Sequence, residues 1–132
     1  MWQAKTSGSF VTLRYGPIES QARPVFHLSC LNSVQIAVLS VYMDFPEREA
    51  GDPLTIEFSA GGKTAPIAGE TAAEDGTGFI YGEAGDFDVT PLLKVLEEKG
   101  PVTMTSGEIA VELSAQDRAP EVAAFAKACT LD

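Results

Sequence analysis

The single histidine of this 132-residue chain, His27, lies close to two nucleophilic side chains, Ser29 and Cys30. In nucleophilic catalysis an imidazole takes the proton of an attacking hydroxyl or thiol. Residues 24–30 alternate as in a β-strand, so Cys30 is expected on the opposite face from His27. Ser29 shares the face of His27 but lies about 7 Å along the strand, beyond hydrogen-bond reach. The pattern predicts a partly exposed histidine with an ordinary pKa, and no catalytic residue.

Acidic residues crowd the segment from 69 to 88, where carboxylate oxygens could hold calcium. These residues are Glu70, Glu74, Asp75, Glu83, Asp86 and Asp88. Their spacing does not fit the twelve-residue calcium loop, and the order Asp-Gly-Thr at 75–77 is not the Asp-Thr-Gly turn of aspartic proteases. Solvated acidic loops are therefore expected and no metal ligand is predicted, with a calcium site as the alternative.

The sequence Gly-Gly-Lys-Thr at 61–64 matches the last residues of a phosphate-binding loop. The complete motif needs a glycine where Glu57 stands, and a helix where Pro66 follows. Two adjacent glycines instead favour a tight turn between two strands. The sequence therefore predicts a hairpin here and no cofactor.

Two cysteines are present, Cys30 near the start of the chain and Cys129 near its end. Cys30 shares a strand face with Phe26 and Leu28, and Cys129 falls on the apolar stripe of a helix expected at 120–129. A disulfide between them would stabilise the fold by ~4–5 kcal/mol and would indicate an oxidising compartment. Two buried, reduced thiols in a cytosolic protein are the alternative.

Charge and hydropathy exclude several classes of partner. The formal net charge is −10 and the isoelectric point about 4.4, so nucleic acids and anionic membrane surfaces are repelled. No apolar run approaches the ~20 residues of a transmembrane helix. Residues 1–10 are too polar for a signal peptide, so for an exported protein we expect a leader that has been removed and an added Met1.

The remaining pattern is mostly that of strands, which are expected at 9–15, 24–30, 34–43, 54–58, 63–67, 78–81, 102–105 and 109–113. A helix capped by Thr90 is expected over 90–99, ending before Gly100, and a second over 120–129. Residues 45–53 are expected to form a surface loop. These elements predict one mainly β domain, 1–132, built as an antiparallel β-sandwich or partly closed barrel with two short helices.

Four short motifs in the chain carry a family resemblance. They are Arg14-Tyr15-Gly16-Pro17, Leu28-Ser29-Cys30, Thr90-Pro91-Leu92-Leu93 and Phe125-Ala126-Lys127-Ala128-Cys129. The chain resembles a family of small, exported, uncharacterised bacterial β-rich proteins with one early and one C-terminal cysteine. This resemblance implies an envelope location and a β-rich fold, and it brings no catalytic residue to carry over. The acidic segment 69–88 is where the chain departs most from the family.

Two classes of function follow from these patterns. The favoured one is a non-enzymatic periplasmic or secreted module that binds an envelope protein or another envelope component, and a homodimer is left open. The alternative is a hydrolase that uses acidic residues or a metal. Convergence of Glu70, Asp75, Glu83, Asp86 or Asp88 in a concave pocket would favour the hydrolase, whereas dispersed carboxylates would favour binding.

Overall fold

The computed structural model describes residues 1–16, 24–43, 45 and 49–130. Within these residues the chain forms nine strands and two helices. The strands are β1 (Trp2–Ser7), β2 (Phe10–Tyr15), β3 (Phe26–Leu31), β4 (Ile36–Val41), β5 (Pro53–Ala60), β6 (Lys63–Ala73), β7 (Ile80–Gly85), β8 (Val102–Ser106) and β9 (Ile109–Leu113). The helices are α1 (Thr90–Leu96) and α2 (Arg118–Ala128).

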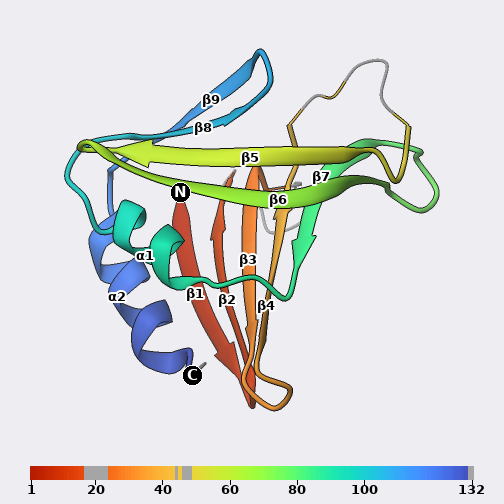
Figure 1. Ribbon diagram of the computed structural model, residues 1–132. Coiled ribbons are helices and arrows are strands. Elements are labelled where there is room, and N and C mark those ends of the chain that lie inside the picture. The colour runs from red at the N-terminus through yellow and green to blue at the C-terminus, as the bar shows by residue number, and fades with distance from the viewer. Residues whose placement is uncertain (17–23, 44, 46–48, 131–132) are drawn as a thin grey trace.

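All of these strands belong to one antiparallel sheet in the order β1-β2-β3-β4-β7-β6-β5-β8-β9. Sequence order is broken at β7, which pairs with β4 on one side and with β6 on the other. Figure 1 shows the long β5–β6 hairpin running across strands β1 to β4, with α1 and α2 together at one side. The mainly β prediction is confirmed, and the sheet is open because β1 and β9 stay at its two edges.

The core lies between the two halves of this curved sheet. Phe26 of β3 meets Phe58 of β5 with ring centroids 5.7 Å apart, and Trp2 of β1 packs on Phe26 at 5.6 Å. All three side chains are fully buried. Burial of a side chain of this size stabilises by roughly 1.5–3 kcal/mol, so these contacts hold the halves together.

Strand β1 is absent from the sequence prediction, which treats residues 1–10 only as a polar segment. The structure pairs it with β2 from Trp2 opposite Tyr15 to Ser7 opposite Phe10. The indole Nε1 of Trp2 donates a hydrogen bond to the carbonyl of Ser114, 2.7 Å away. Ser114 follows β9 directly. A short polar stretch therefore becomes a strand because β2 satisfies its backbone groups and one large aromatic side chain anchors it.

The ends of α1 differ from the prediction. Thr90 is the first residue of the helix and not its cap, and its N–H donates to the carboxylate Oδ1 of Asp88 at 3.0 Å. The helix ends at Leu96, three residues before the predicted end at 99. Neither helix formed by the described residues is long and apolar enough to span a membrane.

A buried arginine explains where α1 ends. Arg118, the first residue of α2, is only 3% exposed, and its Nε donates to the carbonyl of Leu96 at 2.9 Å. A second donor of the same guanidinium binds the carbonyl of Glu98. A cation is favourable at the carbonyl end of a helix, so Arg118 caps α1 from α2 and joins the two helices. Burial lowers the pKa of this guanidinium below its ordinary value.

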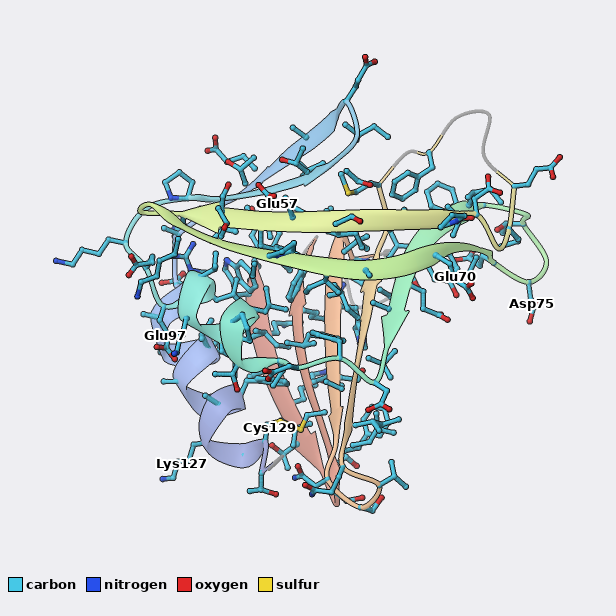
Figure 2. All side chains as sticks on the ribbon, viewed as in Figure 1. Glu57, Glu70, Asp75, Glu97, Lys127 and Cys129 are labelled. Carbon is cyan, nitrogen blue, oxygen red and sulfur yellow. A yellow bond between two sulfur atoms is a disulfide. The ribbon has the colours of Figure 1, made fainter. Side chains whose placement is uncertain are left out.

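The predicted pair of cysteines is bonded in the structure, with 5.8 Å between the Cα atoms of Cys30 and Cys129 (Figure 2). The bond joins β3 to the residue that follows α2. Asn32 adds a second tether, because its amide donates to the carbonyl of Ala128 and its side-chain oxygen accepts the N–H of Thr130, both at 2.9 Å. The C-terminal helix is therefore held against the sheet at its far end.

Removing this disulfide should destabilise the protein strongly. Because the bond closes a loop with a sequence separation of 99 residues, the Cys30→Ala/Cys129→Ala variant should lose ~2–5 kcal/mol of unfolding free energy in urea. Wild-type protein unfolded with a reductant is the control and should show a similar loss. A loss within error of zero, or two free thiols in the mass spectrum of unreduced protein, would contradict this.

Candidate functional site

The outer face of the sheet carries a row of polar side chains across five strands. Strand register places Arg14 of β2 opposite His27 of β3, His27 opposite Ser40 of β4, Ser40 opposite Glu83 of β7, and Glu83 opposite Glu70 of β6. Directly opposite residues project from the same face of a sheet. The row lies opposite the core, because the neighbours of His27 along β3 are buried inside. Residues far apart in sequence thus share one surface.

The predicted separation of His27 and Ser29 is wrong. Their backbone positions are two residues apart on one face of β3, yet Ser29 Oγ lies 3.4 Å from His27 Nδ1, within hydrogen-bond distance. Side chains lean along the strand, and a repeat of about 7 Å between backbones does not fix the distance between their tips. Cys30 faces the core as predicted and is closed in the disulfide.

The histidine is also less ordinary than predicted. Burial lowers the pKa of His27 below its usual 6.5, and the neighbouring Arg14 guanidinium lowers it further. The imidazole is therefore neutral at neutral pH, which is the state that a general base requires.

The His27–Ser29 pair nevertheless lacks the surroundings of a catalytic nucleophile. Ser29 is only 7% exposed, and β3 is paired with β2 and β4 along its whole length. The backbone amides of β3 donate their hydrogen bonds within the sheet, so none of them points to the position where an oxyanion would form beside Ser29. The contact is best understood as a hydrogen bond that satisfies a nearly buried hydroxyl.

Two of the acids expected in solvated loops lie on strands instead. Glu70 belongs to β6 and Glu83 to β7, directly opposite each other. The prediction stops the first strand at 67 and begins the second at 78, but mutual pairing carries β6 to Ala73 and starts β7 at Ile80. Backbone pairing outweighs the low strand propensity of the acids and glycines in this segment.

The Glu70–Glu83 pair is electrostatically unfavourable. Facing side chains in an antiparallel pair have Cβ atoms about 4.5–5.5 Å apart, and like charges there destabilise the sheet. Within the described part of the chain no lysine or arginine forms an ion pair with either carboxylate. Glu83 accepts one hydrogen bond, from the hydroxyl of Tyr81 at 3.3 Å. The pair is therefore a concentrated negative charge on an accessible face.

Aromatic rings lie beside these carboxylates. Tyr81 stacks on Tyr42 with ring centroids 4.8 Å apart and an angle of 25° between the planes, and both rings are half-buried. Burial and the Glu83 carboxylate raise the pKa of the Tyr81 phenol above its ordinary value, so it remains a hydrogen-bond donor. We call Tyr42, Tyr81, Glu83 and Glu70 the tyrosine–glutamate face.

The other acids that the sequence singles out do not join this face. Asp75 lies at the tip of the turn between β6 and β7, apart from Glu70 (Figure 2), and Asp88 binds the first amide of α1. Asp86 is exposed just after β7. No group of three or more potential metal ligands occurs among the residues that the structure describes. Of Glu70, Asp75, Glu83, Asp86 and Asp88, only Glu70 and Glu83 lie directly opposite each other.

The Gly-Gly-Lys-Thr segment forms the predicted hairpin turn. Ala60 pairs with Lys63 across the two glycines, and Gly61 and Gly62 adopt φ angles of +55° and +83°. Two successive positive φ angles are the requirement of the two-residue turn that suits a twisted hairpin. These glycines shape the backbone, and no helix follows them to bind phosphate in the manner of the complete motif.

Neutralising one member of the glutamate pair should stabilise the fold. Glu70→Gln removes one of two like charges at directly opposite positions, so the unfolding free energy should rise by ~0.2–1 kcal/mol at low salt. The gain should shrink at about 1 M salt. Asp75→Asn is the control, since it changes the net charge equally but lies in an exposed turn. Destabilisation by Glu70→Gln, or an equal gain from the control, would contradict this.

The lowered pKa of His27 predicts an acid-sensitive fold. The unfolded chain binds a proton near pH 6.5, whereas the folded chain binds it only at lower pH. The contribution of neutral His27 to the free energy of unfolding is therefore fully present above pH 6.5. It is lost as the pH falls through the pKa of His27 in the folded chain. His27→Gln should reduce the shift in urea midpoint between about pH 7.5 and about pH 5. An unchanged shift would show that other groups cause the decline.

Comparison with family profiles, with curated proteins and with solved structures found no match.

Proposed function

We propose that this protein is a non-enzymatic, exported binding module whose tyrosine–glutamate face binds a basic segment of another envelope protein. The observation that carries the proposal is the pairing of Glu70 with Glu83 beside the stacked ring of Tyr81. Among the described residues no lysine or arginine pairs with these two carboxylates, and like charges at opposite positions weaken the free protein. A partner that supplies the cation would remove this penalty on binding.

The chemistry of the face favours arginine or lysine in the partner. A guanidinium can stack on the exposed part of Tyr81 while its N–H groups bind Glu83 and Glu70, since arginine combines cation–π stacking with planar recognition of carboxylates. Tyrosine and arginine are also the residues that dominate the energy of protein interfaces. The net charge of −10 attracts a basic partner at long range as well.

Export is supported by the disulfide and by the resemblance to an exported family. Structural disulfides persist in oxidising compartments and are rare in the cytosol. Cys30 and Cys129 are bonded across nearly the whole chain. A periplasmic or secreted location therefore belongs to the same proposal.

The hydrolase alternative is less well supported. Glu70 and Glu83 are neighbours, but they project from the outer face of an antiparallel sheet. Neither of them lines the cleft that the described residues form between β6 and α1. A pair of carboxylates that hydrolyses a substrate acts on opposite sides of a bound bond and therefore needs a concave site.

Affinity capture with charge variants tests this proposal. Immobilised wild-type protein and the Glu70→Gln/Glu83→Gln variant are incubated with solubilised envelope extract of the producing cells. We expect a protein that wild type captures at low salt, that about 0.5 M salt releases, and that the variant captures at least about tenfold less, as for a lost charged contact.

The matched control is Glu108→Gln/Glu112→Gln, which removes the same charge from exposed positions at and beside β9. It should capture the partner as well as wild type does. Equal capture by all three proteins would contradict the assignment of the face. Hydrolysis of a general ester, peptide or glycoside substrate that Glu70→Gln/Glu83→Gln abolishes would establish the alternative instead.

A further inference from the structure

A cleft of about 410 Å³ lies between the start of β6 and helix α1, away from the tyrosine–glutamate face. Lys63 and Thr64 line one wall, and Thr90 and Lys94 line the other. The buried side chain of Val95 also lines the cleft. The volume is at the lower end of the range that small-molecule sites occupy.

Two lysines and one carboxylate line the cleft, in a chain with a net charge of −10. The chain has nine lysines and arginines against nineteen acids, yet two of the nine line this one cleft. Lys63 Nζ lies 3.8 Å from a carboxylate oxygen of Glu98, and the Lys63 side chain is 53% exposed, so this ion pair is loose. Lys94 has no ion pair within the described residues. Both ammonium groups can therefore turn to a bound anion.

A backbone donor is available as well. In a two-residue hairpin the residues that flank the turn exchange the closing hydrogen bonds, so the amide of Lys63 points to β5 and that of Thr64 points away from it. Pro66 is the next residue of β6 whose backbone nitrogen faces the same way as that of Thr64. Proline has no N–H, and it is common at strand edges that lack a partner. Strand β7 joins β6 only from Glu70 onward. The N–H of Thr64 is thus directed to the side of β6 that no strand of the described residues covers at this position.

Asp88 also lines the cleft, but its carboxylate is already engaged by the amide of Thr90. Its remaining charge repels an anion, which places the preferred anion position between Lys63 and Lys94. The lining residues that carry hydrogen-bond donors are Lys63, Lys94, Thr64 and Thr90.

We propose that this cleft binds a small organic anion through a carboxylate or phosphate group held between Lys63 and Lys94. The site is independent of the tyrosine–glutamate face and uses none of its residues. Carboxylate and phosphate share the chemistry that these donors recognise, since ammonium groups bind either anion as point charges.

Titration of the ¹⁵N-labelled full chain with citrate and, separately, with inorganic phosphate tests the proposal. The amides of Thr64 and Lys94 should shift and saturate with at least one probe below about 10 mM, where even a weak site fills. The probe that binds more tightly identifies which of the two anionic groups the site prefers.

Variants of the cleft should change this affinity in opposite directions. Lys94→Gln should weaken it about tenfold or more, as expected for the loss of a charged hydrogen bond. Asp88→Asn should strengthen it, because the amide oxygen can still accept the Thr90 N–H while the repulsive charge is gone. Lys127→Gln on α2 is the control for net charge and should leave the affinity within about twofold, since Lys127 is exposed in the last turn of α2, does not line the cleft and is screened by salt.

Two results would overturn the proposal. One is that neither probe shifts the Thr64 and Lys94 amides in wild-type protein. The other is that Lys94→Gln and Lys127→Gln weaken binding equally, because the effect would then come from overall charge. The unchanged spectrum of residues outside the cleft verifies that each variant is folded.

Discussion

The pairing of β7 with both β4 and β6 is the constraint on which the rest of the structure depends. Strands β1 to β4 follow one another along the chain, and β5, β6, β8 and β9 form the other half, so β7 is the strand that makes one sheet of them. This pairing requires β7 to approach β4 and β6 closely. A Cβ on Gly82 would lie 2.9 Å from the Val41 side chain, and one on Gly69 would lie 2.3 Å from the carbonyl oxygen of Glu83. Glycine at these two positions lets the strands meet.

The same pairing creates the proposed binding surface. It places Tyr81 against Tyr42 and Glu83 against Glu70, residues that are far apart along the chain or separated by a turn. The sheet then carries a like-charge pair that costs stability. Local penalties of this kind persist where the surrounding structure supplies enough stability, and here the disulfide and the aromatic core do so.

Much of the fold follows from the sequence alone. The alternation of β3, the glycine turn before β6 and the apolar stripe of the C-terminal helix are local patterns, and each predicted that its element exists. The bounds differ: the helix predicted over 120–129 is Arg118–Ala128, and Cys129 follows it in an extended conformation. The strand β1 and the length of β6 were missed because both depend on a neighbouring strand that supplies hydrogen bonds to a polar segment. No local pattern reveals such a partner.

The candidate site is less accessible to sequence reasoning. Acid spacing suggested loops, whereas the Glu70–Glu83 contact is a consequence of register across two strands. The predicted distance from His27 to Ser29 is wrong because the distance depends on side-chain direction and not on the backbone repeat. Arg118 gave no signal, since its partners are backbone carbonyls 20 and 22 residues away. The strand predicted at 78–81 already includes Tyr81, and the alternation of Phe79, Tyr81 and Glu83 extends its exposed face to the glutamate.

Photo-crosslinking tests most directly whether the tyrosine–glutamate face is the binding surface. A photoreactive amino acid is placed at Ala72, the cross-strand neighbour of Tyr81 on β6, and in a second protein at Glu112 on β9. After irradiation in envelope extract, we expect position 72 to form a covalent adduct with a partner at a segment rich in arginine or lysine, and position 112 to form none. Equal adducts from both positions, or adducts from position 112 alone, would contradict the account.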